Sequence, residues 1–342
     1  MNYQVGAVAV GAFRSLILLG SGEVYDWSNT GSVNLENINT KENNPPQLIK
    51  NIPGKVMGIS AGVCHSLALL DSGEIYGWDD NVPKQLGNRI TKKRKRPQLI
   101  KNIPDKVIKI SAGDFHSLAL LETGKVYGWG LNGDGQLGDG STKKSSRPQL
   151  MKTIPGKVVD IATGTYHSLV LLESGKVYGW GRNGFGQLGD GTNKDRNLPQ
   201  LITSLPSKVV GIAAGDNHSL AVLKSGKVYG WGCNIYDQLG DGTAHNRKRP
   251  QVIDFIQGKV VALAGSYQHS LALLENGKVC GWGENGKGQL GNDLPRDVPF
   301  PHLVSNIDKR ILLCPFGKGG RAIGFTELEN KYRELLNQEI RL

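Results

Sequence analysis

A fixed spacing of 51 residues constrains the fold of this chain more than any other feature. Tryptophan recurs at this interval six times without an insertion or deletion, at Trp27, Trp78, Trp129, Trp180, Trp231 and Trp282. Arg14 stands where a parallel histidine series would begin, and that series continues with His65, His116, His167, His218 and His269. Such a period is typical of solenoids and propellers, in which each unit buries its faces against its neighbours. We therefore expect one repeat domain, although 342 residues would suggest two by length alone.

Each unit has the pattern of four short strands. In the third copy, we expect strands at residues 107–113, 116–121, 125–130 and 148–151, the last one beginning with a proline. Glycine-rich turns separate the second strand from the third and the third from the fourth. Four strands too short to bury their own faces are typical of a propeller blade. The sequence therefore predicts an all-β propeller, in which the tryptophan of the third strand packs between neighbouring blades.

The period also predicts the domain boundaries. The propeller should occupy residues 1–325, with complete units at 5–55, 56–106, 107–157, 158–208, 209–259 and 260–310. Residues 311–325 keep the register of the first two strands, with Gly320 at the histidine position, so we interpret them as a decayed seventh repeat. Six blades, or six with a reduced seventh, both stay open.

A helical pattern follows at residues 326–342. Thr326 and Glu329 form a capping box, and one face carries Leu328, Tyr332, Leu335 and Leu342. We expect this C-terminal tail to pack on the propeller as a helix that covers an open edge.

Charge and cysteine usage restrict the partners and the compartment. The net charge of +11 favours an acidic partner, such as nucleic acid, an anionic membrane surface or an acidic protein; a basic surface with no such partner is the alternative. The four cysteines occupy unrelated positions of the repeat, which favours reduced thiols in an intracellular protein: Cys64, Cys233, Cys280 and Cys314. We recognise neither a secretory signal nor an apolar run long enough to span a membrane.

Three motifs recur in successive units and are clearest in the third. They are Ala-Gly-Asp-Phe-His-Ser-Leu-Ala-Leu at 112–120, Gly-Lys-Val-Tyr-Gly-Trp-Gly at 124–130 and Asn-Gly-Asp-Gly-Gln-Leu-Gly at 132–138. Across residues 5–310 the chain closely resembles the repeats of the regulator of chromosome condensation family. Members of that family are seven-bladed propellers, and the founding member binds the small GTPase Ran and nucleosomes and drives nucleotide exchange. Others are scaffolds, ubiquitin-ligase modules and the plant UV-B photoreceptor.

Two departures narrow what this resemblance implies. The founding member exchanges nucleotide with help from a β-wedge inserted in one blade, whereas the equal units of this chain leave no room for such an insertion. The photoreceptor carries Gly-Trp-Arg motifs, whereas this chain has Gly-Trp-Gly or Gly-Trp-Asp, which argues against photoreception. Exchange activity therefore stays open.

A second resemblance concerns origin. The near-perfect repeats, the loops rich in Asn, Lys and Ile, and the Glu-rich C-terminal segment resemble effector proteins that intracellular bacteria inject into host cells. Some such effectors carry this repeat and act on host small GTPases, and the C-terminal run resembles a type IV secretion signal. This implies a location in the host cytoplasm or nucleus; an acidic amphipathic tail with no such role is the alternative.

Two sets of loops should share one face of the propeller, because the turns of a four-stranded meander alternate between its ends. The loop before each histidine carries a variable pair of residues. The resemblance assigns the Asp and His residues of this loop to nucleotide exchange, which points to Asp114, His116, Asp216 and His218. From these loops we predict a partner-binding site at Asp114, Phe115, His116, Tyr166, His167, Asp216, Asn217, His218 and Tyr267.

The loop between the third and fourth strands carries basic tracts. They would form a basic face around the binding site, made of Lys92, Lys93, Arg94, Lys95, Arg96, Lys143, Lys144, Arg147, Lys194, Arg196, Arg247, Lys248 and Arg249. The tract at 92–96 also matches a nuclear import signal, with a solvated loop as the alternative.

The histidines do not suggest catalysis or metal binding. They occur once per unit, so a ring would keep them apart, and we expect each to be buried and bonded to a backbone carbonyl. The glycine-rich segments lack the Lys-Ser/Thr of a phosphate-binding loop and are interpreted as turns. We identify no nucleophile–base pair, carboxylate dyad or cofactor fingerprint.

These observations predict a binding protein without a cofactor, most simply a monomer. The expected partner is a small GTPase of the Ran or Rab kind, bound at the loop face, whose nucleotide state or location would change. Any exchange would work through binding energy alone. The alternative is a non-catalytic scaffold, or a propeller that binds chromatin or nucleic acid.

Overall fold

The computed structural model describes the chain over residues 5–11, 14–28, 46–63, 65–79, 94–291 and 296–304. All regular structure in these segments is β-strand, so none of them contains a helix that could cross a membrane. The predicted seventh repeat at 311–325 and the tail at 326–342 lie outside the described residues.

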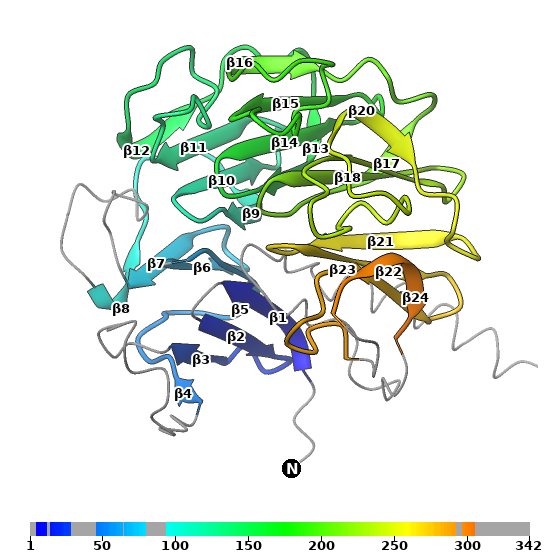
Figure 1. Cartoon of the computed structure of the whole chain (residues 1–342). Helices are drawn as coiled ribbons and strands as arrows, with labels where there is room; N and C mark the ends of the chain where they lie inside the picture. Colours follow the sequence, from blue (N-terminus) through cyan, green and yellow to red (C-terminus); the bar gives the residue numbers. More distant parts are fainter. Residues whose placement is uncertain are drawn as a thin grey trace, which may run out of the picture.

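Six antiparallel sheets of four strands follow one another around a common centre (Figure 1). The first strand of each blade is innermost, and consecutive first strands contact one another; in order they are β1 (Val5–Gly11), β5 (Val56–Ala61), β9 (Val107–Ala112), β13 (Val158–Thr163), β17 (Val209–Ala214) and β21 (Val260–Gly265). The second strands are β2 (Arg14–Leu19), β6 (His65–Leu70), β10 (His116–Leu121), β14 (His167–Leu172), β18 (His218–Leu223) and β22 (His269–Leu274).

The outer half of each blade completes the sheet. The third strands are β3 (Val24–Ser28), β7 (Ile75–Asp79), β11 (Val126–Gly130), β15 (Val177–Gly181), β19 (Val228–Gly232) and β23 (Val279–Gly283). The fourth strands lie at the periphery (Figure 1): β4 (Gln47–Leu48), β8 (Arg94–Leu99), β12 (Ser145–Leu150), β16 (Arg196–Leu201), β20 (Arg247–Val252) and β24 (Val298–Leu303). The all-β propeller with four strands per unit is therefore confirmed.

The fourth strand begins earlier than expected. In the third blade it starts at Ser145 rather than at Pro148, because the ladder with β11 resumes at the pair Gly130–Ser145 after a bulge. The fifth blade repeats this with the pair Gly232–Arg247. The basic tracts therefore lie partly on outer strands, and only partly in the loops where we placed them.

The tryptophans fill the space between blades, as predicted. Five of them have no exposed surface, namely Trp78, Trp129, Trp180, Trp231 and Trp282. Trp180 illustrates the environment: it packs with Leu118 and Met151 of the preceding blade, and its indole N–H donates to the carbonyl of Gln136, 2.8 Å away. The same indole-to-carbonyl bond recurs one and two blades further on, from Trp231 and Trp282.

A second set of bonds between blades involves the histidines. The Nε2 atoms of four histidines lie 2.8–2.9 Å from a serine hydroxyl 52 residues ahead, in the next blade: His65 with Ser117, His116 with Ser168, His167 with Ser219, and His218 with Ser270. These rings are buried, as expected, but the prediction that each of them bonds to a backbone carbonyl was wrong. The carbonyl is bonded instead to the serine, because the Ser168 hydroxyl donates to Gln136 O at 2.9 Å.

This arrangement determines the histidine tautomer. Since the single hydroxyl hydrogen of Ser168 is directed to Gln136, the Nε2 atom of His116 must carry a hydrogen and donate it to the serine. A glycine leaves room for each ring. A Cβ atom at Gly164 would lie 2.3–2.5 Å from His167 and from the carbonyl oxygen of Gly215, so no larger residue fits there.

We expect the propeller to lose stability as the pH falls from about 6.5 toward 3. Burial lowers the pKa of His65, His116, His167 and His218 from 6.5 to about 3, and that of His269 to about 4. The unfolded chain therefore binds more protons throughout this window, and at pH 5.0 each histidine should cost up to about 2 kcal/mol. Urea unfolding at pH 7.5 and 5.0 measures the difference. A His167→Asn variant should show a shallower pH dependence, and equal midpoints at both pH values would contradict the expectation.

Arg14 replaces the histidine in the first blade. Its guanidinium donates to Ser66 Oγ at 2.7 Å, which is the position that a histidine would contact. It also forms a buried ion pair with Asp79 of the second blade. The first seam is therefore held by an ion pair where four others have a neutral hydrogen bond.

The sixth blade lacks this connection. His269 is buried, yet its Nε2 atom has no hydrogen-bond partner among the described residues, and Ser15 of the first blade is only half-buried. Among the described strands, the contacts between inner strands run from β1 to β21 without an equivalent link from β21 back to β1. Within the part of the chain that the structure describes, the first and sixth blades thus do not form a seam of the kind seen between the other blades.

Candidate binding site on the loop face

The two predicted sets of loops lie side by side at one end of the blades. In the third blade, the backbone N–H of Leu131, which follows strand β11, donates to the carbonyl of Phe115 at 2.8 Å. The next three blades repeat this bond, from Arg182 to Tyr166, from Cys233 to Asn217 and from Glu284 to Gln268. The loop before each histidine therefore shares a face with the glycine-rich loop, which we call the loop face.

Two carboxylates converge on one hydroxyl near the centre of the loop face. Thr165 Oγ1 lies 2.9 Å from the carboxylate of Asp114 and also hydrogen-bonds that of Asp216. Thr165 and Asp216 are joined by a backbone bond as well, of 3.2 Å. These three residues occupy the same position in three successive blades and form a single acidic patch, in which Asp114 and Thr165 are buried and Asp216 is partly exposed.

Aromatic side chains lie beside this patch. The rings of Phe115 and Tyr166 stack with their centroids 5.6 Å apart, and the guanidinium of Arg182 lies 5.5 Å above the Tyr166 ring. Both rings are half-buried, as are Tyr267 and Asn217. The pairs before the histidines thus combine negative charge with partly exposed aromatic surface.

The negative charge of this patch affects the pKa values of two tyrosines. Burial raises the pKa of Tyr166, and the carboxylates of Asp114, Asp134 and Asp216 raise it further. Burial likewise raises the pKa of Tyr267, with Asp216 adding the next largest effect. Both phenols therefore stay protonated at neutral pH and can act as hydrogen-bond donors to a partner.

The predicted site residues do not all reach the surface. His116, His167 and His218 have no exposed surface, and Asp114 is only 3% exposed. They lie beneath the loops and hold them in place, while the partly exposed groups are Phe115, Tyr166, Asp216, Asn217 and Tyr267. Among the described residues, no three His, Cys, Asp or Glu side chains are grouped so that they could hold a metal ion.

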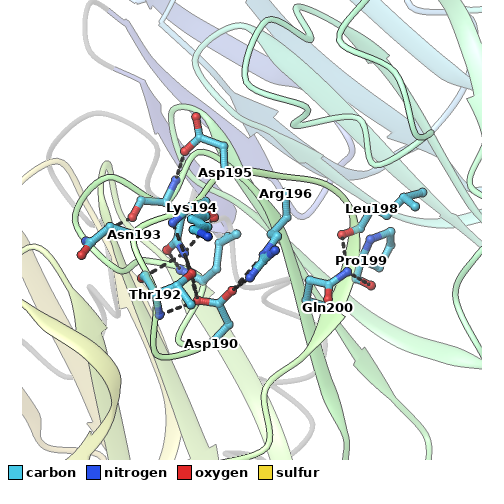
Figure 2. A network of polar contacts seen from close by, with 11 residues as sticks. Asp190, Thr192, Asn193, Lys194, Asp195, Arg196, Leu198, Pro199 and Gln200 are labelled. Carbon is cyan, nitrogen blue, oxygen red and sulfur yellow. Dashed lines mark hydrogen bonds and ion pairs between the residues drawn. The ribbon is translucent and has the colours of Figure 1, made fainter.

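Some side chains of the basic face form ion pairs with aspartates, whereas others are exposed to solvent. Arg196 donates two hydrogen bonds to Asp190, at 2.8 and 2.9 Å, in a network with Thr192 that Figure 2 shows. Arg247 and Asp241 form the same pair in the next blade. The exposed basic side chains of this face are Arg96, Lys143, Lys144, Lys194, Lys248 and Arg249, whereas Arg147 is half-buried. Lys92 and Lys93 lie outside the described residues, and only the backbone is described for Arg94 and Lys95.

Several residues of the loop face were missed by sequence reasoning. Arg182 covers Tyr166, and Asp134 adds negative charge to it. Ile235 and Tyr236 expose apolar surface on the loop after β19. All four occupy variable positions of an otherwise regular motif, and that variability was the available signal.

Comparisons with known proteins agree with this architecture. The sequence profile of the RCC1-like domain matches residues 2–321. The ultraviolet-B receptor UVR8 of Arabidopsis thaliana is 32% identical over 310 residues, which are 87% of this chain and 70% of the receptor. The E3 ubiquitin-protein ligase HERC2 of Homo sapiens is 33% identical over 275 residues, which are 78% of this chain but only 6% of the ligase.

Solved structures show the same fold. The crystal structure of Prp20p from Saccharomyces cerevisiae has a TM-score of 0.76 at 24% identity, covering 96% of this chain and 85% of that one. The repeat, the blade and the matched profile lead to one conclusion: the chain belongs to the family of RCC1-like domains.

Proposed function

We propose that this chain binds a small GTPase of the Ran or Rab kind through its loop face and modulates the nucleotide state or the location of that GTPase. The observation that carries the proposal is the cluster of Asp114, Thr165 and Asp216 beside the stacked rings of Phe115 and Tyr166. Such a patch suits a protein partner that presents a basic side chain flanked by apolar surface.

The family supports a partner of this class. The solved structure of Prp20p is described together with the binding of that protein to Gsp1p and to histones. The described blades of this chain carry four strands each and no inserted element, so a wedge of the kind that assists exchange is not available from them. Any exchange would arise because the loop face binds the nucleotide-free GTPase more tightly than the nucleotide-bound form.

Fluorescent-nucleotide release from a panel of purified Ran- and Rab-type GTPases tests the proposal. We expect at least one GTPase to bind, either with faster nucleotide release or with retention of the nucleotide, and an Asp216→Asn variant to weaken that binding. A Lys101→Ala variant, altered where the chain leaves the fourth strand of its blade, is the control. A chain that binds none of the panel but binds nucleosomes or DNA would overturn the proposal in favour of a chromatin-binding propeller.

The resemblance to secreted bacterial effectors, and the host-cell location that it implies, stay predictions. They rest on the near-perfect repeats, on the loops rich in Asn, Lys and Ile, and on residues 326–342, which are not among the described residues.

A further inference from the structure

The end of the propeller opposite the loop face carries a ring of exposed aliphatic side chains. Each innermost strand has a β-bulge directly after its first residue, and in four successive blades the bulged residue is apolar and exposed: Met57 (40%), Ile108 (47%), Val159 (41%) and Val210 (51%). A bulge re-aims a side chain out of the sheet, and here it does so at the same position in each blade. We call these four residues the bulge ring.

The members of the bulge ring are neighbours in space. Strands β5, β9, β13 and β17 contact one another in that order. Immediately beside the ring, Lys109 Nζ reaches Asp160 of the next blade at 2.6 Å, and these residues directly follow Ile108 and Val159. The four aliphatic side chains therefore occupy equivalent positions on adjacent strands, next to one another around this end of the propeller.

Lysines surround this surface. One exposed lysine precedes the first valine of each inner strand from the second blade on, at Lys55, Lys106, Lys157, Lys208 and Lys259. Two of them pair with glutamates, Lys157 with Glu173 and Lys259 with Glu275. In the fifth blade Lys224 takes the position of the glutamate, so two lysines adjoin Val210, the most exposed member of the ring. The occupant that fits is an apolar segment with acidic residues.

The described part of the chain ends on this face, directly before a segment of that kind. In earlier blades the chain turns from the end of the fourth strand to the next inner strand within seven residues, as from Ile253 to Val260. Val304 is the counterpart of Ile253 and makes the same backbone bond, to Val279. The last described residue, Val304, therefore lies on the side of the sixth blade where the bulge ring lies, and residues 305–342 follow it in the sequence.

We propose that residues 326–342 dock on the bulge ring as an amphipathic helix. Leu328, Tyr332 and Leu335 follow helical spacing, and Glu339 falls on the same face, where it would meet the lysines. The segment carries four glutamates against three basic residues, which complements the exposed lysines beside the bulge ring. The docked helix would leave the loop face free for a partner.

Hydrogen exchange of residues 326–342 in the full chain tests this inference. The double variant Ile108→Asp with Val210→Asp removes apolar surface at exposed positions and adds negative charge beside the acidic helix. We expect tail amides in the parent to exchange at least tenfold more slowly than in a random coil, and this protection to be lost in the double variant. Leu335→Asp should have the same effect from the other side of the contact.

The matched control is Leu198→Asp with Ile235→Asp, which changes two exposed aliphatic residues away from the ring and should leave the tail protected. Tail amides that exchange at random-coil rates in the parent, or that stay protected in the ring variant, would overturn the proposal. Protection that rises with protein concentration would also overturn it, because it would assign the ring to a second copy of the chain.

Discussion

Replacing Trp180 with alanine is expected to lower the free energy of unfolding by about 3–5 kcal/mol. The indole has no exposed surface and packs with Leu118, Met151 and Ile161 from two blades, so its removal leaves a cavity in a seam rather than at an edge. It also leaves the carbonyl of Gln136 without its indole donor. Trp129, at the same position one blade earlier and equally buried, should behave alike.

Urea unfolding followed by circular dichroism measures the effect of the tryptophan substitutions. Leu198→Ala is the control, because an exposed leucine on an outer strand should change stability by less than about 0.5 kcal/mol. A Trp180→Ala variant as stable as the parent, but impaired in partner binding, would show that the ring acts as a surface platform instead.

Changes at the inner and outer parts of the loop face should have separable effects on the kinetics of binding to a GTPase partner. Asp216→Asn and Tyr166→Ala remove groups at the acidic and aromatic patch, where water is excluded in the complex. We expect them to raise the dissociation rate about 30- to 100-fold, since interface anchors act mostly through that rate.

Neutralising the exposed lysines Lys143, Lys144 and Lys248 should slow association about 3- to 10-fold at low salt, with little effect in 0.5 M salt. Lys50→Ala with Lys101→Ala and Lys152→Ala removes the same number of charges where the chain leaves the fourth strands. Surface plasmon resonance at two salt concentrations separates the two rates. If nucleic acid is the partner, the order reverses: the lysine changes abolish binding and Asp216→Asn strengthens it. Inner and outer variants that all bind the GTPase like the parent would show that the site lies on another face.

The strands and the buried tryptophans could be predicted because the internal repeat serves as an alignment. The sequence pattern that places His116 at the start of a strand and Trp129 in a buried position recurs in the other units. The start of the fourth strand could not be placed, because its first residue is determined by a bulge in the pairing with Gly130 rather than by a residue preference. The ion pair of Arg14 with Asp79 could not be predicted either, because it joins two residues that both depart from the repeat, one on each side of a seam.

The candidate site was foreseen only in part. The residues before each histidine were recognised as variable loop positions, yet the bridge from Thr165 to Asp114 and Asp216 was not. In a propeller, residues 51 apart are neighbours, so this cluster could have been inferred by reading one position across successive units. The bulge ring was less accessible, because a valine at the start of a strand gives no sign that its neighbour will be turned outward.

The hydrogen bond from a histidine to a serine 52 residues ahead restricts how the number and length of the blades can change in evolution. Each unit from the second to the fifth carries both halves of this contact, a histidine that bonds to the next blade and a serine that is bonded from the preceding blade. Duplication or deletion of one such unit therefore leaves the histidine–serine hydrogen bonds between blades intact. An insertion or deletion of a few residues inside a unit would instead disrupt two of these bonds. The number of blades can then vary in whole steps of 51 codons, while the length of each blade cannot drift.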